Sequence, residues 1–428
     1  MNRSEIADYC LEKLKEKGIE KANCNVSFSE KKELNVEADR MSLFRTTFNA
    51  NIGISVIQNQ KKGSLSINKT DKESINKAVD DVILMANSSH SDSAHDISPF
   101  QPKGEFQKGE KFADMENMYL RLEEFVEYVK DIHPTINLEA AIIDYNQSIS
   151  YFKNSNGVNY KTRVGMYGFG PMFTAKDGKD TSSFNYSGMS MIKLDKPLVE
   201  KGSIKRLLKQ STEQVRTKSI PSKFKGKILV SPDCISDFLN FITSDISDGQ
   251  IISGKSIYMD KLEHQITSNN FSLHSKPVSN QITDGYFLTS DGFLAEDLTI
   301  IDKGVLKSHL LSLYGANKTG RTRAINDGGA YIIDPGNKKY EELIKGIDKG
   351  ILLERFSGGS PSSSGEFSGV AKNSYFIENG EVKYPISETM ISGNISELFK
   401  NIIAISKNQI DFGYCILPWV AFDGVTIS

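Results

Sequence analysis

The last quarter of the chain most constrains how it can fold. Between residues 365 and 394, short β-rich runs alternate with glycine and asparagine at positions typical of turns. Glycine is needed where φ is positive or where another segment approaches the backbone closely. The spacing therefore predicts several short strands joined by tight turns in this region.

Composition narrows the class of protein. A chain of 428 residues is long enough for two or three domains, and its 38% hydrophobic and 25% charged residues are typical of a globular protein. The formal net charge of −2 leaves no positive excess to neutralise phosphates, so nucleic-acid binding is not favoured. No stretch approaches 18 consecutive apolar residues, and we therefore expect no membrane span.

The N-terminal segment and the cysteines indicate a cellular compartment. Residues 1–20 are charged throughout and lack an apolar core, so we expect no signal peptide. The cysteines are scattered and form no C-x-x-C pair, which argues against a disulfide framework or a zinc knuckle. We expect a cytoplasmic protein with four reduced thiols: Cys10, Cys24, Cys234 and Cys415.

The periodicity predicts an α+β fold, with a small N-terminal α/β unit followed by β-rich domains that carry a few packed helices. Three domains are expected. They are an N-terminal α/β domain (1–90), a central helix-plus-strands domain (91–221) and a C-terminal β-rich domain (222–428).

Local signals place some elements within these domains. Two short strands are expected at 25–29 and 33–36, and residues 87–111 are polar and aperiodic, which predicts an exposed linker. Ser231 followed by Pro232 is a favourable helix start, because proline suits the first helical position. That helix is expected to run towards Asp248.

Histidine spacing gives no metalloprotease helix, since none of the six histidines forms an H-E-x-x-H motif. His90 and His95 stand near Asp92 and Asp96 in the polar segment, where they could chelate a metal weakly. Solvated loop histidines are the alternative, because a metal site needs ligands that are held in place beforehand.

Other reactive groups remain ambiguous. Cys234 near a helix start could have a lowered pKa, or it could be a buried packing thiol. Asp237, Asp245 and Asp248 could perform acid–base chemistry, or they could form a solvated face. Residues 358–365 could cradle an anion, or they could be a structural loop. The residues alone define no catalytic centre.

The tail motifs, however, are long and specific. Residues 365–374 (GEFSGVAKNS), 377–380 (IENG), 388–394 (ETMISGN) and the segments around 417–419 (LPW) and 423–427 (DGVTI) resemble the TldD/PmbA family, nearer its PmbA (TldE) branch. Weaker matches extend the resemblance over most of the chain. An older label for this family is modulator of DNA gyrase.

The resemblance implies that the two branches of the family have different roles. TldD-like members look like zinc peptidases with an H-E-x-x-x-H helix, whereas PmbA-like members lack that site and pair with a TldD-like subunit. In this chain the corresponding window is 239–244 (LNFITS), which contains no imidazole or carboxylate, and Cys415 is misplaced for the family's metal-binding cysteine. We therefore expect no metal ligands and no catalytic residues in this chain, with zinc held by the partner.

Two functions follow. The preferred one is a PmbA/TldE-type subunit of a zinc metallopeptidase that acts on peptides or unfolded proteins. The alternative is a non-catalytic binding or scaffold protein that forms a homodimer. If a peptide docks as an added strand, glycine-bearing backbone would bind it. We nominate six residues as peptide- or partner-facing, with buried turns as the other interpretation: Gly365, Glu366, Phe367, Ser392, Gly393 and Asn394.

Overall fold

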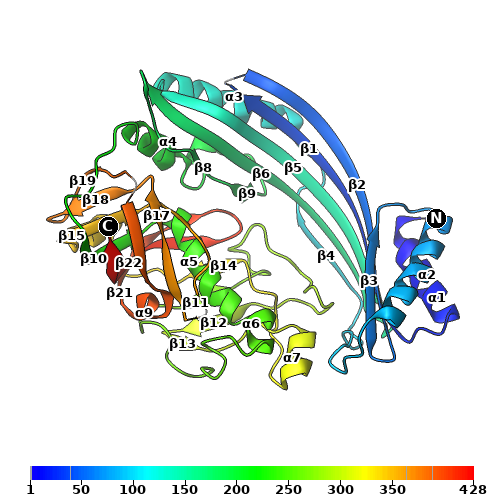
Figure 1. The fold of residues 1–428 in the computed structure, drawn as a ribbon. Helices are drawn as coiled ribbons and strands as arrows, with labels where there is room; N and C mark the ends of the chain where they lie inside the picture. The colour runs from blue at the N-terminus through cyan, green and yellow to red at the C-terminus, as the bar shows by residue number, and fades with distance from the viewer. Residues whose placement is uncertain (1, 39, 363, 388) are drawn as a thin grey trace.

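The computed structural model describes residues 2–38, 40–362, 364–387 and 389–428. Glu388, which begins one of the tail motifs, lies outside the described residues. The fold is α+β, as predicted, and is built on two mixed sheets. Figure 1 shows the long N-terminal sheet arching over the C-terminal sheet, with α1 and α2 at one end of the arch and α3 and α4 at the other.

The N-terminal sheet has the strand order β3-β2-β1-β5-β6-β4, and the short strands β7, β8 and β9 also pair with β6. Its strands are β1 (Lys21–Glu37), β2 (Arg40–Gln58), β3 (Lys61–Ile67), β4 (Gly104–Gly109), β5 (Ile136–Asn154), β6 (Asn159–Asp177), β7 (Asp180–Thr181), β8 (Asn185–Tyr186) and β9 (Met189–Met191). Its helical segments are η1 (Arg3–Glu5), α1 (Ile6–Glu16), α2 (Lys72–Ser88), α3 (Met115–Ile132), η2 (Leu198–Glu200) and α4 (Ile204–Glu213).

Two of these helices begin at carboxylates that cap free backbone N–H groups. The Asp71 side chain accepts a hydrogen bond from the Ser74 backbone N–H at 2.8 Å. The Asp114 side chain accepts one from the Asn117 N–H at 3.1 Å. Each bond satisfies a donor that the first helical turn leaves unpaired.

The prediction of two short strands at 25–29 and 33–36 was wrong, because β1 runs unbroken through both. The charged residues between them suggested an interruption, but they lie on paired strands. Lys31 is opposite Thr47 of β2 and Asn146 of β5, for example. Long neighbours on both sides satisfy the backbone of this polar stretch, so its composition does not end the strand.

The linker predicted at 87–111 was wrong in its last part. Gly104–Gly109 forms β4, which pairs in parallel with β6 from Gly104↔Tyr160 to Gly109↔Gly165. Its polar composition suits an edge strand, because β6 is its only strand neighbour in the described ranges. The proposed boundary near residue 90 stays a prediction. The sheet crosses it, since β1 pairs with β5 from Asn23↔Asn154 to Val36↔Ala141.

The C-terminal sheet has the main order β13-β12-β11-β14-β22-β10-β15-β18-β19, and the β16-β17-β20 group joins it through β22. Its strands are β10 (Phe224–Val230), β11 (Leu273–Ser275), β12 (Leu298–Asp302), β13 (Val305–Leu306), β14 (Tyr331–Ile333), β15 (Lys349–Leu353), β16 (Arg355–Gly358), β17 (Glu366–Lys372), β18 (Tyr375–Glu378), β19 (Glu381–Pro385), β20 (Thr389–Asn394), β21 (Ile402–Asp411) and β22 (Ile416–Ile427). Its helices are α5 (Pro232–Asp245), α6 (Asp248–Ile252), α7 (Leu313–Thr319), α8 (Tyr340–Lys345) and α9 (Ile395–Lys400).

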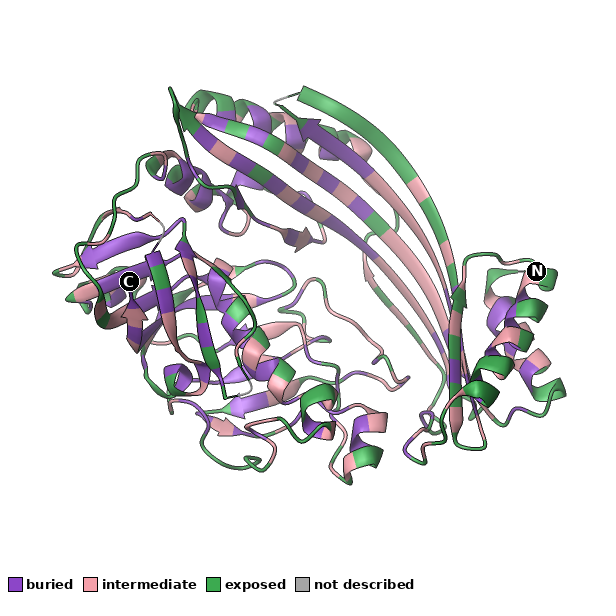
Figure 2. Cartoon of the chain, viewed as in Figure 1, coloured by how far each residue is buried: buried purple, intermediate pink, exposed green. Residues whose placement is uncertain are grey.

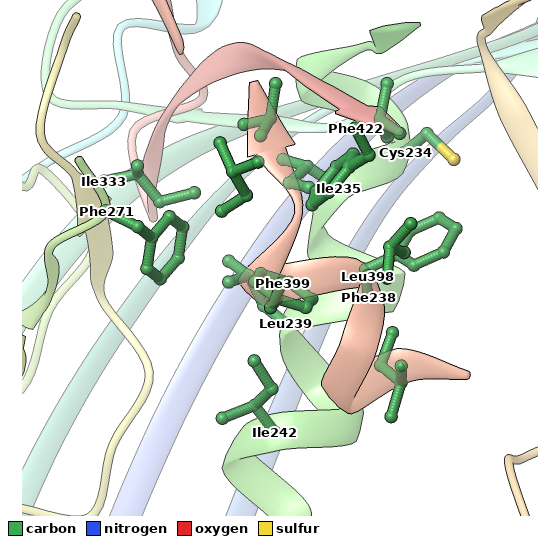
Figure 3. Packing of buried hydrophobic residues seen from close by; sticks show 14 of the residues in the cluster. Cys234, Ile235, Phe238, Leu239, Ile242, Phe271, Ile333, Leu398, Phe399 and Phe422 are labelled. Carbon is green, nitrogen blue, oxygen red and sulfur yellow. The ribbon is translucent and has the colours of Figure 1, made fainter. Parts of the chain in front are cut away.

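The largest core cluster lies between this sheet and helices α5 and α9. Figure 3 shows Ile235, Phe238 and Ile242 of α5 pointing into it beside Phe399 of α9 and Phe422 of β22. The prediction that Cys234 is a packing thiol was correct, because Cys234 is fully buried in this cluster and burial raises its pKa. All four cysteines are free and buried.

A buried ion-pair cluster joins the two regions. Arg206 of α4 pairs with Asp233 at the start of α5 and with Glu354 at the end of β15. Burial disfavours the Arg206 charge, but the Glu354 and Asp233 carboxylates outweigh that cost and raise the pKa of Arg206. In the described parts of the chain, no helix is long and apolar enough to cross a membrane.

Candidate functional site

Helix α5 has one face in the core and another on a cleft. As predicted, it begins at Ser231 with Pro232 in the first helical position, and it ends at Asp245. Leu239 and Ile242 pack into the core, whereas Asn240 and Ser244 are exposed and line the cleft. Because α5 is anchored by its buried face and by the Asp233–Arg206 pair, the cleft face is held rigidly.

The cleft has a volume of about 630 Å³. Its lining comes from α5, from the end of β16 and from residues 359–362, which follow β16. Gln250, Lys255 and Tyr258 close one end. The sequence left residues 358–365 open as an anion cradle or a structural loop. Of these, residues 358–362 and Gly365 line the concave surface, and Ser363 lies outside the described residues.

Two of the three aspartates singled out in the sequence reach this cleft. Partial burial raises the pKa of Asp237, which the Arg355 charge opposes, and also raises the pKa of Asp245, which accepts a hydrogen bond from Ser256 Oγ at 2.9 Å. Eight helical residues separate them, or about 12 Å along the axis, so they cannot share one proton. Asp248 instead accepts hydrogen bonds from the Ser312 backbone N–H and side chain.

The residues present do not fit a zinc ion. In the window 239–244, the side chains that face the cleft are Asn240, Phe241 and Ser244, none of which supplies an imidazole, carboxylate or thiolate. Cys415 is buried and lines a different hollow, beside Pro232. Across the described ranges, no three His, Cys, Asp or Glu residues cluster as metal ligands would.

The polar segment around His95 has other contacts. The Asp92 carboxylate pairs with Lys318 at 2.8 Å and accepts a hydrogen bond from Tyr314 at 2.9 Å, which together hold its pKa below the usual range. The His95 ring stacks on Tyr314 with centroids 4.9 Å apart. Asp96 pairs with Lys21. These side chains connect the N-terminal region to α7.

The six nominated residues are brought together. Glu366 lies opposite Asn394 and Phe367 lies opposite Gly393, while Ser392 occupies the next position on β20. Gly365, with φ +88°, lines the cleft. A role in binding peptide or partner stays a prediction for all six.

Their side chains also have structural contacts. The Asn394 side chain caps α9 by accepting from the Ser396 N–H at 3.0 Å, and it donates to the Ser364 carbonyl at 2.8 Å. Phe367 is buried against Phe238. β17 pairs with β16 only over Gly369–Lys372, and β20 pairs with β22 only at Ile391 and Ser392. The pairs Glu366–Asn394 and Phe367–Gly393 therefore have a strand neighbour on one side only.

The free edge at the cleft belongs to β16, which the sequence analysis missed. β16 pairs with β17 and with no other strand in the described parts of the chain. Its residues Phe356 and Gly358 line the cleft, whereas Arg355 stacks on Tyr186 at 3.7 Å. The Gly-Gly-Ser run after it was the available signal, because it marks a place where backbone is accessible.

Residues 223–428 match the PmbA/TldA metallopeptidase C-terminal domain. A metalloprotease PmbA homolog of Buchnera aphidicola is 27% identical over 301 residues, which cover 68% of this chain and 66% of that protein.

Two solved structures share the whole fold. TldE from Thermococcus kodakarensis superposes with a TM-score of 0.84 at 18% identity, covering 99% of this chain and 100% of that one. A Bacteroides thetaiotaomicron protein described as a candidate modulator of DNA gyrase gives 0.88 at 20% identity, covering 99% and 98%. The C-terminal part of the chain, residues 223–428, therefore belongs to the PmbA/TldA metallopeptidase family, and the chain as a whole is similar to PmbA homologues and to TldE.

Proposed function

We propose that this chain is the PmbA/TldE-type subunit of a TldD/TldE-like zinc metallopeptidase that acts on peptides or unfolded proteins. The observation that supports this most directly is the α5 cleft. It lies in a domain that matches a metallopeptidase family, and Asn240, Phe241 and Ser244 line it from the window 239–244, to which the family resemblance assigns the metal ligands. The subunit would contribute a binding surface, and a TldD-like partner would supply the zinc and the hydrolysis.

The cleft suits an extended peptide. Residues Phe356–Gly358 carry backbone donors and acceptors at the strand edge beside it, and Asn240 and Ser244 face them from α5. An extended peptide can gain main-chain hydrogen bonds by adding to such an edge. In this proposal Gly365 contacts the peptide, while Glu366, Phe367, Ser392, Gly393 and Asn394 hold the loop and α9 in place around it.

The same proposal places the complex in the cytoplasm, where free thiols such as the buried Cys234 and Cys415 stay reduced. No zinc, other cofactor or nucleic acid is assigned to this chain.

Reconstitution tests the proposal. The purified chain is mixed with a TldD-like protein, and cleavage of an unstructured reporter peptide is followed with each component alone and with both. We expect cleavage to require both chains and to be abolished by a chelator. Chelator-sensitive cleavage by this chain alone, or full cleavage by the partner without it, would contradict the proposal.

A further inference from the structure

The cleft beside α5 carries opposite charges towards its two ends. Asp237 lies on the second turn of α5, and Asp245 ends the helix about 12 Å further along its axis. Figure 2 shows buried and exposed residues mixed along this helix, whose exposed residues Asn240 and Ser244 line the cleft. Among the described residues that line the cleft, Lys255 is the one cation.

Local structure fixes the position of Lys255. Helix α6 ends in a Schellman motif, in which Gly254 has φ +70° and the Lys255 N–H donates to the Gln250 carbonyl at 3.0 Å. The next residue, Ser256, donates its hydroxyl to the Asp245 carboxylate at 2.9 Å. These two contacts hold the backbone of Lys255 at the end of α5, where its side chain lines the cleft.

The charges of Lys255 and Asp237 are not neutralised within the described part of the chain. Lys255 is exposed, and its ammonium group pairs with no described carboxylate. Burial raises the pKa of Asp237 and the Arg355 charge opposes this, but no described cation forms an ion pair with it. A ligand with a negative group at one end and a positive group further along complements these two charges.

We propose that this end of the cleft binds the C-terminal carboxylate of a peptide through Lys255. The inference rests on the proposed function and adds a substrate class to it. With the carboxylate on Lys255, an extended chain of about 3.3 Å per residue covers the distance to Asp237 in three or four residues. The ligand is therefore an unfolded chain with a free carboxylate and with a lysine or arginine three or four residues before it.

A chain terminus suits this position better than an internal segment does. The main chain of an internal segment would have to continue past the residues that close this end of the cleft. Gln250 is one of them, and its side-chain amide supplies a second donor for a carboxylate beside Lys255. A terminal carboxylate satisfies both donors and needs no further path.

The free edge of β16 lines the same cleft through Phe356 and Gly358. A peptide can form main-chain hydrogen bonds with this edge while its terminus reaches Lys255. Main-chain bonds are common to all sequences, so the discrimination between peptides comes from Lys255 and Asp237.

Peptide binding to the purified full chain, without a partner subunit or zinc, tests the inference. The probe is an unstructured peptide of about ten residues with an N-terminal fluorophore, one lysine about three residues before its end, and either a free carboxylate or an amide at its C-terminus. We expect the carboxylate form to bind about tenfold more tightly in fluorescence anisotropy, because hydrogen bonds between charged groups are the stronger ones. Lys255→Met should remove this ratio. The matched control Lys261→Met changes an exposed lysine that does not line the cleft and should keep the ratio.

A second pair of peptides tests the other charge. Both end in a free carboxylate, and they carry either lysine or glutamine about three residues before it. We expect the wild-type chain to prefer the lysine form about threefold, as a partly exposed ion pair allows. Asp237→Asn should remove this preference and keep the preference for a free carboxylate. Equal binding of the lysine and glutamine forms by the wild type would overturn the role of Asp237.

Equal affinity of the wild-type chain for the carboxylate and amide peptides would overturn the inference, and so would a ratio that survives Lys255→Met. Failure of the wild-type chain to bind either form at about 1 mM would overturn it as well.

These outcomes are separate from those of the proposed function. Reconstituted cleavage that requires both chains but treats the carboxylate and amide peptides alike would leave the proposed function intact and overturn this inference alone. Cleavage that does not require this chain would remove the proposed function, whereas a carboxylate preference that depends on Lys255 would still support the site.

Discussion

The outer edge of the N-terminal sheet and the C-terminal core place their phenylalanines in opposite ways. In the arching N-terminal sheet, Phe44 and Phe48 project from an unpaired edge. In the C-terminal core, Phe238 of α5 and Phe367 of β17 are buried, and the short strand β16 has a free edge beside the cleft. The comparison teaches that the same residue type can lie exposed at a strand edge in one region and stabilise a core in the other, according to whether another element packs on it.

The largest expected effect tests this contrast directly. Phe238 contacts the rings of Phe356, Phe367 and Phe422, so Phe238→Ala leaves a cavity and should lower the free energy of unfolding by about 3–5 kcal/mol. Phe48→Ala, at an exposed position, should change it by less than about 0.5 kcal/mol. Urea unfolding measures both. Similar losses for the two variants would remove the distinction between the regions.

A second substitution removes the buried ion pairs that connect the two regions. Arg206→Met leaves the Asp233 and Glu354 carboxylates buried without their cation, which should cost about 3–5 kcal/mol. The control Arg321→Met removes a pair with the exposed Asp260 and should cost less than about 1 kcal/mol. Equal effects in urea unfolding would show that the buried cluster does not hold the two regions together.

A third change tests the cleft without touching the core. A Cβ on Gly359 would meet open space, so Gly359→Trp should fold normally and narrow the cleft. We expect cleavage of a reporter peptide by the reconstituted complex to fall about tenfold, or 1.4 kcal/mol. Gly188→Trp also enters open space, but at a different hollow, and serves as the control. Unchanged cleavage by Gly359→Trp would exclude this cleft from peptide binding.

The smallest expected effect concerns pH. His309 is buried, its Nε2 lies 3.1 Å from the Tyr258 carbonyl beside the cleft, and burial lowers its pKa below the usual 6.5. The unfolded chain therefore takes up the proton first, so the stability is complete above about pH 6.5 and declines as the pH falls through the lowered value.

His309→Gln keeps a neutral donor and should make the unfolding free energy fall less between pH 6.5 and 5.5 than it does in the wild type. The difference between the wild-type and variant profiles isolates this residue from the other titrating groups. Parallel profiles would mean that the pKa of His309 is not lowered by folding.

Local chemistry predicted part of this structure from the sequence alone. Ser231-Pro232 marks a real helix start, because the preference for proline at the first helical position is local. The unbroken β1 could not be predicted, since its polar middle is satisfied by β5 more than a hundred residues later in the chain. Long-range pairing, rather than propensity, determined that strand.

The candidate site, too, could be predicted from the sequence only in part. The missing imidazoles in window 239–244 could be read from the sequence, as could the glycine-rich loop that forms one wall of the cleft. The sequence did not indicate that Gly365 and Asn240 line the same cleft, and it did not indicate that β16 has a free edge. Both depend on how β16, β17 and β20 are arranged next to α5, which no single segment specifies.

The zinc content of the purified chain tests the central claim most directly. After incubation with zinc and removal of the free metal, elemental analysis should find well below one zinc per chain, because the α5 cleft offers no tetrahedral set of ligands. One tightly bound zinc per chain would contradict the proposal that a partner must supply the metal.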